Sequence, residues 1–137
     1  MKKVKLIVQQ KEINELVGGK EFDFSLYDEA TVIDAIIEVD NKISAKGEFP
    51  VKEYHSLLHM MYNPIENRIY DHVIIIAVSK TQPLIDVKHK PESKLPDGTT
   101  VKILLKDIFG YKMSEKEKIV DYDTFRQAML KRDYKIS

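Results

Sequence analysis

Alternation of apolar and polar residues near the start of the chain predicts two strands. The first covers about residues 3–10 and the second residues 21–26, and in each every other side chain is apolar. A period of two places alternate side chains on opposite faces, as in a strand with one buried face. Gly18-Gly19 ends the connection between them. The apolar positions are Val4, Leu6, Val8, Phe22, Phe24 and Leu26.

A helical pattern follows these two strands. Thr31 is a good N-cap, and Asp34 three residues later approximates a capping box. The apolar residues after it recur at helical spacing, so we expect a helix over Val32–Ser44. They are Val32, Ala35, Ile36, Val39 and Ile43.

A second helix is predicted over Val51–Tyr62. Pro50 suits the start of a helix, and an apolar stripe at helical spacing follows it. Asn63-Pro64 ends the pattern, because the residue before proline is disfavoured in the α region. The stripe consists of Val51, Tyr54, Leu57, Leu58 and Met61.

The β-branched run Val73–Val78 predicts a strand covered on both faces, and therefore central in a sheet. Residues 81–94 read as a loop, with Leu84–Val87 as a short edge segment. Pro96-Asp97-Gly98 has the composition of a tight turn. The alternation of Val101, Ile103 and Leu105 then predicts a closing strand.

The remaining residues predict a C-terminal helix with an apolar stripe of Tyr122, Phe125 and Met129. Asp121 or Asp123 is its expected N-cap. This helix either docks on the sheet as an added layer or projects to bind a partner or a second copy. We favour docking.

Composition limits the functions to consider. The chain has 22 basic and 22 acidic residues, which does not suggest a nucleic-acid or anionic-membrane partner. It has no cysteine, which excludes disulfides, thiol catalysis and cysteine metal sites. The longest apolar run is too short to span a bilayer, and no apolar leader follows Met1. We therefore expect a cytoplasmic protein that binds no nucleic acid, membrane or cofactor.

The order of predicted elements is that of a β-grasp fold, and the sequence resembles the ubiquitin-like sulfur carriers. These include the small subunit of molybdopterin synthase and the sulfur carrier of thiamine synthesis. The resembling segments are Phe22–Phe24, Ala30–Ile36, Ile76–Val78 and Leu95–Val101. The resemblance implies an α+β, ubiquitin-like mixed sheet with a packed helix, an inserted helix and a C-terminal helical extension. The predicted division is a β-grasp domain over residues 1–106, with the insert at about 50–63, and an extension over 107–137.

The chemistry of these carriers lies in a C-terminal Gly-Gly whose carboxylate is adenylated and converted to a thiocarboxylate. Here that position corresponds to Phe109-Gly110, and the sequence continues to Ser137. Gly18-Gly19 is internal and cannot replace it. The resemblance therefore favours a non-catalytic protein-interaction module that is not an enzyme, whose partner is an adenylating enzyme, another protein or a second copy. The alternative is a sulfur carrier that becomes active after processing at Gly110.

His55 and His59 are the candidate metal ligands. They lie four residues apart on the predicted second helix, a spacing that occurs in zinc sites. Ser56 follows His55 where the protease motif would have a glutamate. A small metal-dependent enzyme is therefore a third hypothesis, and two histidines that flank a packed helix are the interpretation we favour.

Overall fold

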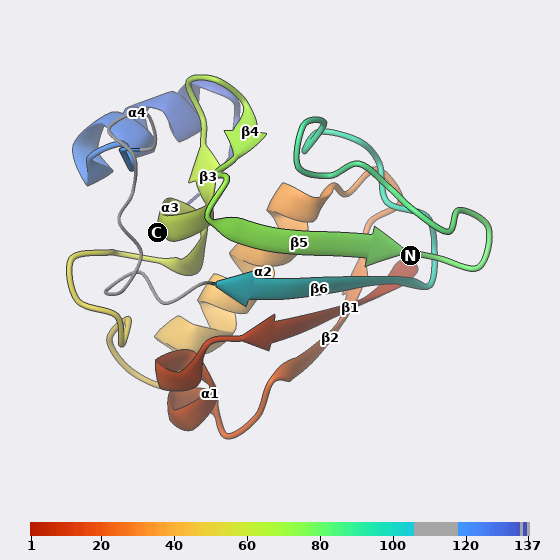
Figure 1. Cartoon of the computed structure of the whole chain (residues 1–137), viewed down its shortest axis with the longest axis horizontal. Coiled ribbons are helices and arrows are strands. Elements are labelled where there is room, and N and C mark those ends of the chain that lie inside the picture. The colour runs from red at the N-terminus through yellow and green to blue at the C-terminus, as the bar shows by residue number, and fades with distance from the viewer. Residues whose placement is uncertain (106–117, 135, 137) are drawn as a thin grey trace.

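A computed structural model of the chain describes residues 1–105, 118–134 and 136. Within these ranges the chain forms a mixed sheet with helices packed beside it (Figure 1). The elements in chain order are β1 Lys2–Gln9, α1 Lys11–Val17, β2 Glu21–Leu26, α2 Val32–Ser44, α3 Leu57–Met61, β3 Tyr62–Asn63, β4 Arg68–Ile69, β5 Val73–Val78, β6 Thr99–Leu105 and α4 Tyr122–Lys131.

The main sheet has four strands in the order β2-β1-β6-β5. The pairs β1–β2 and β5–β6 are antiparallel, and β1–β6 is parallel. An N-terminal hairpin, a helix packed across it and a last strand inserted beside the first define the ubiquitin-like β-grasp fold. The predicted fold class, α+β with a mixed sheet, is confirmed.

The prediction that Val73–Val78 is the central strand is wrong. In the sheet order β5 is an edge strand, and β6 is the strand that returns to the middle beside β1. Ile74 and Ile76 are 40 % and 45 % exposed. A continuous β-branched run does not show that both faces are covered, because folded proteins also leave apolar side chains at their surface.

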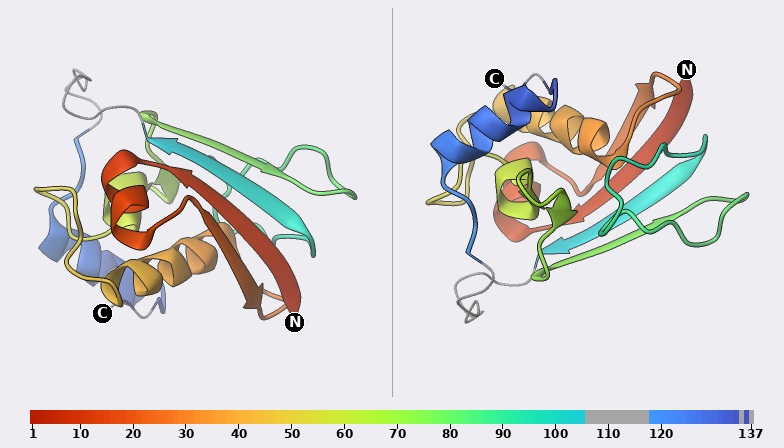
Figure 2. Two further views of the ribbon diagram at one scale, coloured as in Figure 1. Left: turned by 90° about the horizontal axis from the view of Figure 1, so that it is seen from below. Right: turned by 90° about the horizontal axis from the view of Figure 1, so that it is seen from above.

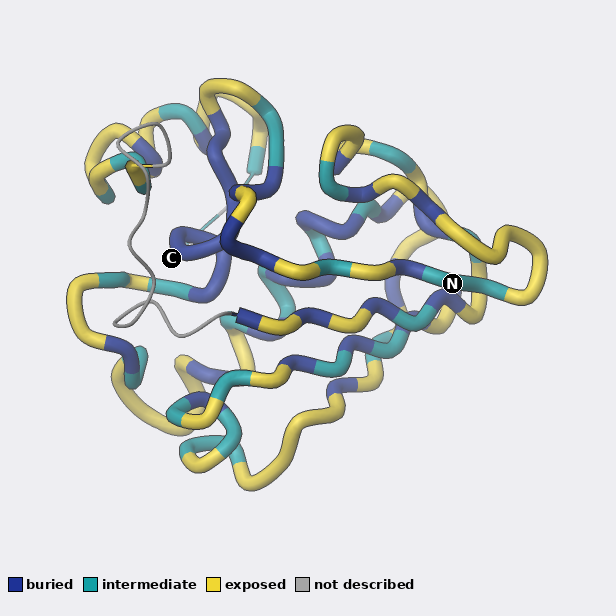
Figure 3. The backbone as a smooth tube through the Cα atoms, in the orientation of Figure 1, coloured by how far each residue is buried: buried dark blue, intermediate teal, exposed yellow. Residues whose placement is uncertain are grey.

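Helix α2 covers one face of the sheet and supplies much of the core (Figure 2). It begins and ends at the predicted residues, and the capping box of Thr31 and Asp34 is present. The Thr31 backbone N–H donates to the Asp34 carboxylate over 2.8 Å. Burial alternates along β1 and β6, as Figure 3 shows, because their inward side chains face α2.

Lys2 is a charged residue on this covered face. Its side chain is buried, and its ammonium donates to the backbone carbonyls of Asp28, Ala30 and Leu95 at 2.9, 2.7 and 2.6 Å. Three carbonyl acceptors replace the water that burial removes from the ammonium. Lys2 therefore joins the start of β1 to two loops that are distant in sequence.

The connection between β1 and β2 contains α1, which the sequence pattern indicated only as a short turn. The Gln10 side chain accepts a hydrogen bond from the Ile13 backbone N–H at 2.7 Å and caps the helix. Gly18, with φ +78°, ends it in the left-handed conformation that suits glycine. Ile13 is the buried residue of this helix.

The predicted helix over Val51–Tyr62 is too long. Helix α3 covers only Leu57–Met61, with Ser56 as its N-cap and Tyr62 already extended. Glu53 has φ +77°, which is incompatible with a continuous right-handed helix from Pro50. The short β3–β4 hairpin that follows was not predicted.

Helix α4 is docked, but on the insert formed by α3 and the β3–β4 hairpin and not on the sheet, where the prediction placed it. Phe125 and Met129 are buried, and Asp121 caps the helix. Arg132 donates through Nε to the Pro64 carbonyl at 2.6 Å. The division of the chain at residue 106 stays a prediction.

Candidate functional site

The outer face of the sheet, opposite α2, is the candidate interaction surface. Helices α2, α3 and α4 all lie on the other side of the sheet (Figure 2). Three apolar side chains on this face are strongly exposed: Ile74 at 40 %, Ile76 at 45 % and Leu104 at 40 %. Ile74 lies opposite Leu104 in the β5–β6 register, so the three form one apolar patch. We call these residues the outer patch.

Charged residues continue this surface across the sheet. Lys102 lies opposite Ile76 in the β5–β6 register, and Lys5 of β1 lies opposite Asp23 of β2. Lys5 forms an exposed ion pair with Glu21 at 3.9 Å, which contributes little to stability. The outer face therefore changes from apolar at β5, through basic in the middle, to acidic at β2.

The edge of β5 is protected by the loop that follows it. The Ile85 backbone N–H donates to the Ala77 carbonyl at 3.0 Å, so the predicted edge segment 84–87 is reduced to an isolated bridge. The Lys88 ammonium donates to the Val73 carbonyl at 3.2 Å. Occupied carbonyls and a lysine hinder the addition of another strand. A partner would therefore contact the face of the sheet more readily than this edge.

The two candidate metal ligands do not lie on one helix. His59 lies in α3, and His55 precedes its N-cap. The Nε2–H of His59 donates to the Val120 carbonyl at 2.8 Å, and its Nδ1 accepts from the His55 backbone N–H at 3.2 Å. Metal binding by His59 would have to break one of these hydrogen bonds. Burial lowers the pKa of His59, which favours the neutral ring.

His55 contributes to the contact between the insert and α4. Its ring stacks on Tyr122, with centroids 3.9 Å apart and an interplanar angle of 12°. The Phe125 ring packs against the His59 ring, with centroids 5.2 Å apart. Within the described ranges no group of three His, Cys, Asp or Glu residues is placed to hold a metal ion.

Asp40 is a residue of interest that the sequence analysis did not identify. Its two carboxylate oxygens accept the backbone N–H groups of Leu57 and Leu58 at 2.7 and 3.1 Å, so it caps α3 from α2. Burial raises the pKa of Asp40 to about 7. Its position on the apolar stripe of α2, between Ile36 and Ile43, is the signal that could have revealed it.

The predicted processing position, Phe109-Gly110, lies outside the described residues. In the part of the chain that the structure describes, no helix combines the length and apolar character needed to cross a bilayer.

The chain is similar to two solved structures at low sequence identity. No protein-family model and no curated protein matches this chain. It is similar to the crystal structure of small archaeal modifier protein 1 of H. volcanii, with 12 % identity and a TM-score of 0.49. It is also similar to the structure of a putative molybdopterin converting factor subunit 1 of Pyrococcus furiosus, with 19 % identity and a TM-score of 0.45. Each match covers 77 % of this chain and 98 % of the other. Both scores are below 0.5, so the fold assignment rests on strand order and connections.

Proposed function

We propose that this protein is a non-catalytic, ubiquitin-like module that binds a partner protein through the outer face of its sheet. The observation that carries the proposal is the outer patch, Ile74, Ile76 and Leu104, on a sheet face that the described helices leave open. Contiguous exposed apolar side chains are a common feature of interaction sites.

The register supports this use of the surface. Ile74 and Leu104 lie side by side on neighbouring strands, and Lys102 lies beside Ile76. An apolar centre with charged neighbours resembles the core and rim of a protein interface. The basic residues of β1 and β6 favour a partner that places acidic groups around an apolar contact.

Affinity capture from the native cell tests this proposal. The full chain and an Ile74→Ser/Ile76→Ser variant serve as baits. Ile65→Ser is the matched control, because Ile65 is 59 % exposed in the turn between β3 and β4. We expect one protein that the unmodified chain and the control retain and the double variant loses. Equal retention by all three baits, with unchanged melting temperatures, would exclude the outer patch as the binding surface.

Self-association is one form of this interaction. Sedimentation equilibrium of the purified chain should then show a dimer, which the Ile74→Ser/Ile76→Ser variant converts to a monomer. A monomer over the whole accessible concentration range would leave only a different protein as partner.

The relation to sulfur carriers is a more specific part of the proposal and rests on the sequence resemblance. If the chain is processed after Gly110, mass spectrometry under denaturing conditions will detect a species ending at that residue in protein from its native cell. In that case an adenylating enzyme is the expected partner. Detection of the full-length mass alone would reject the carrier alternative.

A further inference from the structure

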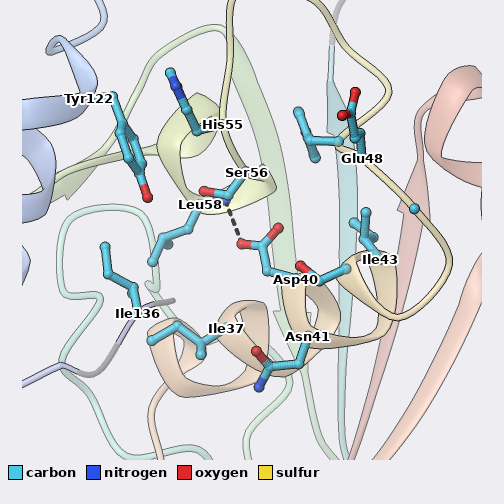
Figure 4. A pocket seen from close by; sticks show the side chains of 13 residues that line it. Ile37, Asp40, Asn41, Ile43, Glu48, His55, Ser56, Leu58, Tyr122 and Ile136 are labelled. Atoms are coloured by element: carbon cyan, nitrogen blue, oxygen red, sulfur yellow. Dashed lines mark hydrogen bonds between the residues drawn. The ribbon is translucent and has the colours of Figure 1, made fainter.

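A cavity of about 170 Å³ lies between α2, the loop before α3 and α4, away from the outer face of the sheet. Figure 4 shows Asp40, Leu58, Tyr122, Ile37 and Ile136 around it. These residues come from segments far apart in sequence, so the cavity forms only in the folded chain. An engineered apolar cavity of about 150 Å³ holds benzene, so this volume suits a ligand of about six heavy atoms.

The lining combines apolar side chains with two carboxyl groups and neutral polar side chains. Ile37, Leu58 and Ile136 provide apolar surface, while Asp40 and Glu48 provide carboxyl groups. None of the described lining residues is a lysine or arginine. The Tyr122 ring, stacked on His55, forms part of the wall of the cavity. This combination favours a ligand with a short alkyl chain and a positive charge.

The Asp40 carboxyl has capacity for a ligand in addition to its structural role. Each of its oxygens accepts one backbone N–H, and each carboxylate oxygen can accept a second hydrogen bond. Desolvation raises the pKa of this group to about 7, so its charged form lacks sufficient compensation in the free protein. A bound cation would supply that compensation.

We propose that this cavity binds a small alkylammonium ion, with the ammonium on the Asp40 carboxylate and the alkyl chain against Ile37 and Leu58. The site is independent of the proposed partner surface on the sheet. The ligand class is a primary amine of about four carbons, which matches the volume and the position of the acid at the wall.

The test is titration of the full chain with n-butylammonium chloride at constant ionic strength, followed by amide chemical shifts. At pH 8 we expect saturable 1:1 shifts of Leu57 and Leu58, whose N–H groups contact Asp40, with a dissociation constant of about 1 mM, since a ligand of five heavy atoms gives modest affinity. The neutral probe 1-butanol should bind at least fivefold more weakly. Non-saturating shifts, or equal binding of both probes, would overturn the proposal.

The pH dependence separates an ionic site from a merely apolar one without any substitution. Because protonation removes the charge of Asp40, affinity should fall about tenfold between pH 8 and pH 5.5, with a midpoint near 7. The other titratable groups facing the cavity are Glu48, His55 and Tyr122. A positive charge on His55 would also repel the ammonium, so the dependence must persist in His55→Gln. Constant affinity across this range contradicts the proposal.

Substitutions provide the second test. Asp40→Asn should weaken n-butylammonium binding at least tenfold at pH 8, while Glu15→Gln, an exposed acid on α1, serves as the matched control and should not change it. Unchanged affinity in a folded Asp40→Asn variant would exclude this carboxyl as the binding group. If the variant does not fold, the pH series on the unmodified chain gives the answer.

Discussion

The two faces of the same sheet differ sharply in what they contain. On the covered face, Leu6, Val101 and Ile103 are at most 1 % exposed and pack beneath the helices. On the open face, Ile76 and Leu104 are at least 40 % exposed. Leu104 lies on the same strand as Val101 and Ile103, and Ile76 lies on the neighbouring strand β5. Burial in the core explains why the residues of the covered face are apolar. It does not explain why Ile76 and Leu104 are apolar. The difference shows that the covered face maintains the fold, and it is the reason for proposing the other face as the binding surface.

The largest effect should come from the covered face. Leu6→Ala removes a fully buried side chain of β1 that lies between Phe22 and Val101 in the sheet register. We expect a loss of about 3–4 kcal/mol in the free energy of unfolding, from lost burial and the cavity left behind. Urea unfolding measures this loss. Lys5→Ala, on the open face of the same strand, is the control, and an equal loss in both variants would remove the distinction between the faces.

A substitution of Lys2 tests whether its buried charge contributes to the stability of the fold. Lys2→Met keeps the length of the side chain but leaves the carbonyls of Asp28, Ala30 and Leu95 without their ammonium donor. We expect destabilisation of about 2–3 kcal/mol at pH 7, because buried acceptors without a partner are costly. Thermal and urea unfolding both report it. Lys3→Met, one residue further and exposed, should change stability by less than about 0.5 kcal/mol.

Asp40 and His59 give the covered side opposite responses to pH. The folded pKa of Asp40, about 7, exceeds the unfolded value near 3.8, so its contribution to stability is present at low pH and is lost as pH rises from about 4 through 7. The pKa of His59 is lowered below 6.5, so its contribution is lost as pH falls below that value.

Unfolding free energies at pH 4.5 and 7.5 measure the Asp40 effect. In the unmodified chain we expect the free energy of unfolding to decrease by about 2 kcal/mol from pH 4.5 to 7.5, and Asp40→Asn should abolish this decrease. The value is smaller than the full pKa shift implies, because Asp40 is only partly buried as a residue. Its matched control, Asn41→Asp, adds a carboxyl one residue along α2 and should retain the decrease. An identical pH profile in the unmodified chain and Asp40→Asn would show that this carboxyl ionises normally.

The smallest effect on stability should come from the open face. Ile76→Lys replaces a side chain that is 45 % exposed, and we expect a change within about 0.5 kcal/mol. Ala77→Lys, on the adjacent inward position, should prevent folding, because Ala77 is fully buried. A large loss of stability in Ile76→Lys would mean that the outer patch is part of the core.

The sequence predicted local features well and the relative positions of elements less well. Period-two alternation located β1, β2 and β6, and Thr31 with Asp34 located the start of α2. The order of strands in the sheet could not come from the run at 73–78, because β-branched residues suit edge and central strands alike. The alternation in β6 correctly predicted that one face of this strand is covered, but it gave no information on the position of the strand in the sheet.

The insert was harder to predict because its contacts are long-range. The apolar stripe after Pro50 is genuine, since Leu57, Leu58 and Met61 are buried, but its residues do not form one continuous helix. The hydrogen bond between His59 and Val120 joins positions 61 residues apart, and no local pattern encodes it. The predicted metal pair therefore lies at a packing contact between the insert and α4.

The attachment of Val120 has a consequence for any cleavage of the chain. Its carbonyl accepts from His59 and its N–H donates to the Tyr70 hydroxyl at 3.0 Å, while Phe125 and Met129 are buried further along. After a break following Gly110, these contacts would therefore hold the N-terminal and C-terminal fragments together without a covalent bond. We expect them to co-elute on size exclusion and to separate only in denaturant, so a processed molecule would retain the compact size of the intact one.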